Sequence, residues 1–153
     1  MKATLLVLVL STTVLYGQQE IQSDLLNVKE MYSEQWTEYV QHPDFLIEYK
    51  FESCDFSSGL NKELLLLKVT NLTNQQLDLE WHIQLYYGDT CSTCQYPTEY
   101  NRTITVNSND TVEGLCTPDT SQPLVIFSKF TDARFAKKSR RLHMFKLANL
   151  TIN

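Results

Sequence analysis

Hydrophobic and polar residues alternate with a period of two along much of the chain. In segments 45–52 and 77–87, one set of alternate positions is apolar and the other is mostly polar. This pattern predicts two strands, each with one buried face and one face in contact with water. The run Leu64–Leu67, followed by Val69, is apolar without interruption. A strand buried on both faces has this composition, so we expect it to be central in its sheet.

Further strands are expected at 100–106, 111–116, 124–130 and 142–152. The Asn-rich segment Asn71–Asn74 favours a turn, and it predicts a hairpin between the strands on either side. About seven strands at this spacing are typical of an all-β, immunoglobulin-like β-sandwich. We assign the sandwich to residues 44–153.

The segment before the predicted sandwich, residues 18–43, has a different pattern. Its apolar residues recur at roughly helical spacing, at Ile21, Leu25, Val28, Tyr32, Trp36 and Tyr39. This predicts a short helix or linker that Ser23 and Asp24 cap and that ends before Pro43. The alternative is an additional edge strand over Trp36–Val40.

The first residues of the chain resemble a targeting signal in composition. Lys2 precedes an apolar stretch from Leu5 to about Tyr16, which is too short to cross a bilayer as a helix. We expect a signal peptide over residues 1–17, cleaved after Gly17, although a buried N-terminal strand is an alternative. No later segment is long and apolar enough to span a membrane, so we expect a periplasmic or secreted protein.

Four cysteines, Cys54, Cys91, Cys94 and Cys116, follow this signal. An even number of cysteines in an exported chain indicates disulfides. We predict the pairs Cys91–Cys94 and Cys54–Cys116. The Cys91-Ser-Thr-Cys94 spacing also permits a thiol-redox motif or half of a zinc site. However, no clear helix begins after it, and the other two cysteines are not paired in sequence.

The composition excludes several classes of protein. The chain has 153 residues, of which 42% are hydrophobic and 20% charged, which is unlike a disordered chain or a polytopic membrane protein. The net charge of −5 disfavours nucleic-acid binding. Basic residues nevertheless gather before the last strand, and they are candidates for contact with an anionic partner: Arg134, Lys137, Lys138, Arg140 and Arg141. The alternative is a solvated loop that keeps edge strands from pairing with other chains.

Other candidate sites rest on short patterns. Asn71, Asn101 and Asn109 begin sequons that a eukaryotic secretory pathway could glycosylate, and a fourth, Asn149, lies in a predicted strand. His82 shares the polar face of its strand with Glu80, which permits a carboxylate–imidazole pair, although an ordinary surface histidine is the simpler interpretation. Tyrosines flank the Cys91/Cys94 loop and could form a stacking platform for a sugar or peptide: Tyr86, Tyr96 and Tyr100.

Several sequence features resemble those of flavobacterial (Bacteroidetes) proteins. The segment Tyr16-Gly17-Gln18 resembles the end of their export signals, and Leu66–Asn74, followed by an alternating strand, is similar to a strand–turn–strand of bacterial immunoglobulin-like domains. The order of Cys54, this segment, the Cys91/Cys94 loop, Gly114-Leu115-Cys116 and Ile126–Phe130 resembles small uncharacterised exported proteins of these bacteria. The resemblance implies no function and no site residues.

These observations favour a non-enzymatic binding or accessory module with an unidentified protein or glycan partner. The sequence contains no phosphate-binding loop, nucleophile elbow or zinc-protease helix. We therefore expect no catalytic residues, metal or cofactor. Two alternatives remain, namely a thiol-redox or zinc-binding protein that uses Cys91 and Cys94, and a secreted N-glycosylated ligand protein.

Overall fold

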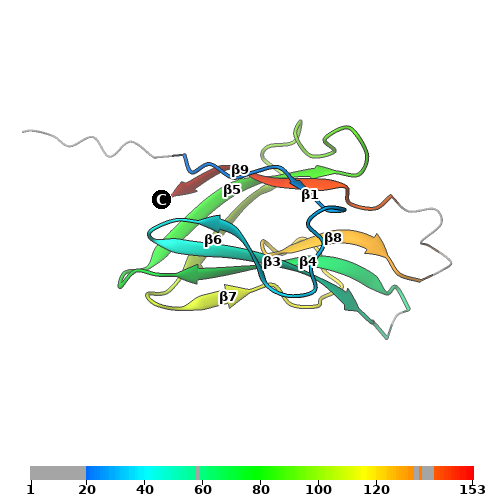
Figure 1. Cartoon of the computed structure of the whole chain (residues 1–153), viewed down its shortest axis with the longest axis horizontal. Coiled ribbons are helices and arrows are strands. Elements are labelled where there is room, and N and C mark those ends of the chain that lie inside the picture. Colours follow the sequence, from blue (N-terminus) through cyan, green and yellow to red (C-terminus); the bar gives the residue numbers. More distant parts are fainter. Residues whose placement is uncertain (1–19, 58, 133–134, 136–139) are drawn as a thin grey trace, which may run out of the picture.

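The computed structural model describes residues 20–57, 59–132, 135 and 140–153. Nine strands in this part of the chain form two antiparallel sheets, and Figure 1 shows β9 and β5 in a layer over β3 and β4. The strands are β1 (Leu26–Asn27), β2 (Thr37–Gln41), β3 (Phe45–Cys54), β4 (Lys62–Asn71), β5 (Leu77–Tyr86), β6 (Asn101–Val106), β7 (Thr111–Glu113), β8 (Val125–Phe130) and β9 (Met144–Ile152). The fold is all-β, with two packed sheets as in a β-sandwich.

One sheet has the order β1-β9-β5-β6, and the other has the order β2-β3-β4-β7 with β8 also paired to β4. β7 pairs with Lys68–Thr70 and β8 with Lys62–Leu66, so both strands use the same edge of β4. Each of the seven segments expected to form strands contains one, and β1 and β2 raise the number to nine. Within the described residues, no helix is long and apolar enough to cross a membrane.

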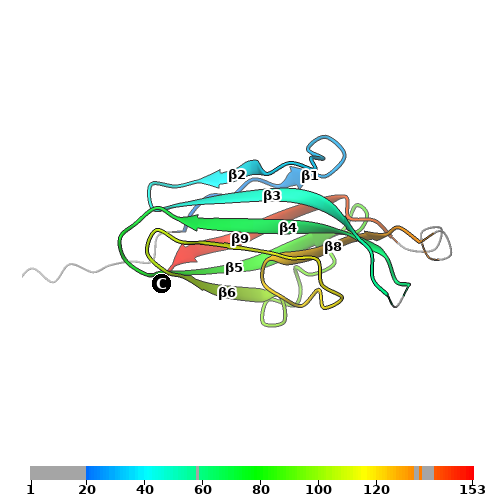
Figure 2. The ribbon, with the colours of Figure 1, turned by 90° about the horizontal axis from the view of Figure 1, so that it is seen from below.

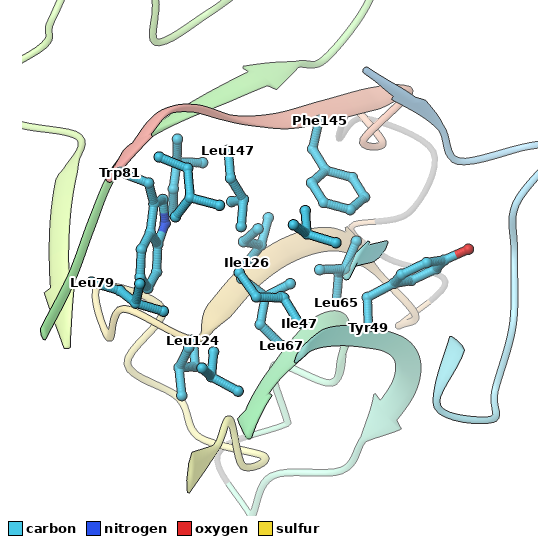
Figure 3. Packing of buried hydrophobic residues seen from close by; sticks show 14 of the residues in the cluster. Ile47, Tyr49, Leu65, Leu67, Leu79, Trp81, Leu124, Ile126, Phe145 and Leu147 are labelled. Carbon is cyan, nitrogen blue, oxygen red and sulfur yellow. The ribbon is translucent and has the colours of Figure 1, made fainter. Parts of the chain in front are cut away.

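The hydrophobic core lies between the two sheets. On β5 the predicted alternation is confirmed, because Leu79 and Trp81 are fully buried and Ile83 is nearly so. Figure 3 shows inner-facing side chains of the two sheets packed against each other: Leu79, Trp81, Phe145 and Leu147 come from one sheet, and Ile47, Tyr49, Leu65, Leu67 and Ile126 come from the other. Each large apolar side chain buried in this way contributes about 1.5–3 kcal/mol to folding.

β4 is buried on both faces, as its uninterrupted apolar run predicts. Leu65 and Leu67 face the main core, whereas Leu64 and Leu66 belong to a second cluster on the outer face of the sheet. This second cluster is formed with Cys54 and Val125 and is flanked by Trp36, Phe56 and Phe127. β4 also has neighbours on both edges, so it is the central strand of its sheet.

The prediction of a helix within residues 18–43 is wrong. Backbone groups of this segment bond to β9 and the residue before it instead, since Ile21 N donates to Leu150 O at 2.7 Å and Val28 N donates to His143 O at 2.8 Å. The hydroxyl of Ser23, expected to cap the helix, donates to Leu147 O. The edge-strand alternative is confirmed for residues 37–41, which form β2. Tertiary contacts with a free sheet edge outweigh the weak helical pattern here.

The prediction of a hairpin around Asn71 is also wrong. β4 and β5 belong to different sheets, so the chain crosses the sandwich at this turn. Asn71 is 1% exposed, and its amide nitrogen donates to the carbonyl oxygens of Gln75, Val106 and Asn107 at 2.8, 3.1 and 2.9 Å. The side-chain oxygen Oδ1 of Asn71 accepts a hydrogen bond from Thr73 N at 2.9 Å. The chain crosses between the sheets again from β6 to β7. The side chain of Asn71 therefore connects these two crossings.

Gly114 lies where β7 and β8 approach each other along the edge of β4. Gly114 N donates to Leu67 O at 2.8 Å, and Leu67 N donates to Leu124 O at 2.9 Å. A Cβ atom at position 114 would overlap with the carbonyl oxygen of Leu124. The absence of a side chain therefore allows both strands to use the same edge of β4.

We expect Gly114→Ala to lower the free energy of unfolding by about 2 kcal/mol, because a backbone carbonyl must move to make room. Urea denaturation followed by tryptophan fluorescence measures this change. Leu115→Ala is the control, since the neighbouring side chain is 65% exposed and its removal should change stability little. Equal stability of the two variants would contradict the proposed overlap.

Candidate binding site

A pocket of about 550 Å³ lies at the end of the sandwich where β4 begins and β8 ends. β4 runs from this end of the sandwich to the opposite one, where the strand ends at Asn71 (Figure 2). Four parts of the chain supply most of the lining, namely the segment around β1, the start of β4, the end of β8 and the start of β9. The volume falls within the usual range for small-molecule sites. We call it the end pocket.

Glu63 is the buried charged group of the end pocket, with 4% of its surface exposed. One carboxylate oxygen accepts a hydrogen bond from Ser128 Oγ at 2.8 Å. The other accepts from Tyr32 OH at 3.3 Å and lies 2.8 Å from Lys129 Nζ. A buried carboxylate is costly unless it is paired and hydrogen-bonded, and these three donors satisfy it and hold its orientation.

A β-bulge places two of these donors together. In the pairing of β4 with β8, Glu63 lies opposite Lys129 and Leu64 lies opposite Phe127, so Ser128 is the additional residue. Bulges redirect side chains that would otherwise alternate between the two faces of a strand. Both Ser128 and Lys129 can therefore reach the same carboxylate.

Tyr32 forms one wall of the end pocket. Its ring stacks on Phe51 with a centroid distance of 4.8 Å and an interplanar angle of 20°, and it remains 45% exposed. Burial of the hydroxyl and, next, the charge of Glu63 raise the pKa of Tyr32 to about 12. The hydroxyl therefore stays protonated at neutral pH and donates to Glu63, while the exposed part of the ring is free to contact a ligand.

Three charged residues lie exposed on the lining of the end pocket: Lys29, Asp89 and Arg141. None of them takes part in the ion pairs formed among the described residues. Because Lys129 neutralises Glu63, the two remaining cations outnumber the one remaining carboxylate. The pocket thus combines an aromatic surface and hydrogen-bonding groups with an excess of positive charge, which suits a hydroxyl-rich ligand that carries an acidic group.

The structure describes two of the five basic residues proposed to contact an anionic partner. Arg140 and Arg141 are both exposed, and Arg141 but not Arg140 lines the end pocket. Arg134, Lys137 and Lys138 lie outside the described residues, as does the expected signal peptide over residues 1–17. The basic segment and the pocket thus meet at Arg141.

Both predicted cysteine pairs are confirmed. Cys54 joins Cys116, and Cys91 joins Cys94, with a Cα–Cα distance of 5.6 Å in each pair. No cysteine is free, since all four lie in the described part of the chain. Two disulfides favour an oxidising compartment outside the cytoplasm.

The Cys91–Cys94 disulfide closes a loop that docks on the edge of β5. The hydroxyl of Thr93, between the two cysteines, donates to Ile83 O at 2.7 Å and accepts from Leu85 N at 2.9 Å. It thereby satisfies two backbone groups that β6 does not reach, because β6 pairs with β5 only as far as His82. These two hydrogen bonds hold the disulfide-closed loop against β5.

The sequons differ in accessibility. Asn71 is buried and its amide nitrogen makes three hydrogen bonds, so the folded protein does not present it for modification. Asn101 and Asn109 are exposed. Asn149, which lies in a predicted strand, is exposed as well, at a bulge where its φ is 53°. Glycosylation of the exposed sequons stays a prediction.

His82 is not a surface histidine, because only 6% of it is exposed. Neither ring nitrogen has a hydrogen-bond partner among the described residues, and Glu80 bonds to the amides of Asn101 and Asn153 instead. The tyrosines considered for a stacking platform do not all line the groove to which Tyr100 contributes. Tyr86 and Tyr96 do not contribute to it.

Sequence reasoning did not identify Glu63 and Ser128. Along its strand, Glu63 occupies the same set of alternate positions as the core residues Leu65 and Leu67. Ser128 likewise occupies the same set as Ile126. A polar residue in the inward-facing register of an otherwise apolar strand is the signal that could have found them. That signal would not have shown that the two side chains meet.

The described residues contain no group of three or more histidine, cysteine or acidic side chains that could hold a metal ion. No protein-family model, curated protein or solved structure matches the chain.

Proposed function

We propose that the protein is an exported, non-enzymatic β-sandwich module of immunoglobulin-like type that binds an acidic glycan. The end pocket receives a sugar unit that carries a carboxylate, such as a uronic acid. The two disulfides support a periplasmic or extracellular location.

The observation that carries this proposal is the combination of groups in one pocket of about 550 Å³. The exposed part of the Tyr32 ring offers an apolar surface to a sugar ring, and Asp89 offers hydrogen bonds to hydroxyl groups. Arg141 and Lys29 supply positive charge for the carboxylate, and the guanidinium can bind it with two hydrogen bonds. A concave site for one sugar unit fits these groups better than a flat protein interface does.

The proposal predicts that glucuronate binds the full chain more tightly than glucose does, by about tenfold or more, because only glucuronate engages the cations. Isothermal titration calorimetry at low ionic strength measures both sugars. Arg141→Gln should abolish most of the difference between them.

Arg140→Gln is the matched control, because it removes the same charge from an exposed neighbour that does not line the pocket. It should bind glucuronate as the unmodified protein does. Equal affinity for glucuronate and glucose, or equal loss in the two arginine variants, would refute the proposed site. If polyglutamate binds and the uronic acid does not, an acidic protein partner replaces the glycan.

A further inference from the structure

A second, smaller groove is lined by residues of β5 and β8 and by Arg102 of the edge strand β6. Its volume is about 210 Å³. The apolar part of its lining comes from β5 and β8 and includes Ile83, Leu85, Ile126 and Phe127. Tyr100 and Arg102 complete it on the side of β6, and none of its lining residues belongs to the end pocket.

Arg102 is directed into this groove by its position in the sheet. It lies opposite Trp81 in the pairing of β5 with β6, and Trp81 is a core residue, so Arg102 is on the inner face. Its Nη1 donates to the carbonyl oxygens of Glu99 and Asn101 at 2.8 and 2.9 Å. Its guanidinium carbon lies 5.8 Å from the centroid of the Tyr100 ring.

The guanidinium of Arg102 is not fully satisfied. Its Nε is buried and has no hydrogen-bond acceptor in the described part of the chain. The ion pairs formed among those residues do not include Arg102 either. A buried N–H donor without an acceptor is destabilising, and a bound anion is one group that would satisfy it.

We propose that this groove binds the carboxylate of a small apolar acid, with Arg102 as the anion-binding residue. Arginine binds a carboxylate through two parallel N–H donors, and Nε–H takes part in that geometry once the Arg102 side chain turns its buried Nε toward the groove. The apolar walls would then cover the hydrocarbon part of the ligand. The volume suits a short aliphatic acid or the last residue of a peptide chain, which present the same chemistry.

Nuclear magnetic resonance of the ¹⁵N-labelled full chain tests this directly, because the Nε–H group gives its own signal. Sodium hexanoate should move the Arg102 Nε–H resonance downfield in a saturable manner. Hexanamide, which has the same apolar part but no charge, should bind about tenfold more weakly or not at all. Acetyl-Gly-Gly-Leu with a free carboxyl group, compared with its amide, tests whether a peptide end is the ligand.

Arg102→Gln should abolish hexanoate binding, and Arg102→Lys should weaken it, because lysine keeps the charge but not the paired donors. Arg141→Gln is the control, since this residue lines the end pocket and not the groove. Hexanoate binding only to the unmodified chain and Arg141→Gln supports the proposal even if glucuronate does not bind. Equal effects of hexanoate and hexanamide, or no shift with any acid, would overturn it.

Discussion

Replacing Cys54 and Cys116 together by serine should lower the free energy of unfolding by about 4 kcal/mol. The disulfide joins residues separated by 62 positions, so its loss returns much conformational freedom to the unfolded chain. Cys54 also belongs to the outer cluster with Leu64 and Leu66, which loses part of its packing. Urea denaturation under oxidising conditions measures the effect.

The matched control is the pair of substitutions Cys91→Ser and Cys94→Ser. These residues are separated by three positions, so the same chain-entropy argument gives only about 2 kcal/mol. The difference of about 2 kcal/mol between the two double variants arises from loop length. If the Cys91–Cys94 variant lost as much stability as the other, the docking of Thr93 on β5 would be the larger contribution.

Asn71→Ala should lower the free energy of unfolding by about 3 kcal/mol, because several backbone groups at the corner lose their partner. The carbonyl oxygens of Gln75, Val106 and Asn107 no longer receive a hydrogen bond, and Thr73 N loses its acceptor. Thermal or urea unfolding followed by circular dichroism measures the loss. Asn71→Asp should also destabilise, because a carboxylate oxygen would face the same three carbonyl oxygens.

Asn101→Ala is the control for this prediction. Asn101 is exposed, and its amide nitrogen donates to the carboxylate of Glu80 on the solvent side of the sheet. The expected change in the free energy of unfolding is therefore within about 0.5 kcal/mol. If Asn71→Ala and Asn101→Ala were equally stable, the corner would not depend on the buried amide. The comparison separates burial from side-chain chemistry, because both variants replace the same residue type.

The strands of this protein could be predicted because their pattern is local. A period of two identified β3 and β5, and an uninterrupted apolar run identified β4 as central, since each depends only on neighbours along the chain. The disulfide pairs could also be predicted, because two close cysteines and two distant ones left few plausible pairings.

Other features depended on contacts that no local pattern records. The spacing of apolar residues before β2 is helical, yet β9 offers a free edge and the segment bonds to it. Asn71 is a common turn residue in sequence, but the crossing of the sandwich made it a buried connector. In both cases the backbone groups found partners far along the chain.

Along β3, β4 and β5 the sequence by itself determined which apolar residues face the core, because alternation of side chains is a property of the extended backbone. Only the tertiary structure decided which polar residues meet. Glu63 contacts Tyr32 and Ser128, which lie 31 and 65 positions away. Strand order, register and one bulge bring them together, and these follow from the packing of the whole chain rather than from any single segment.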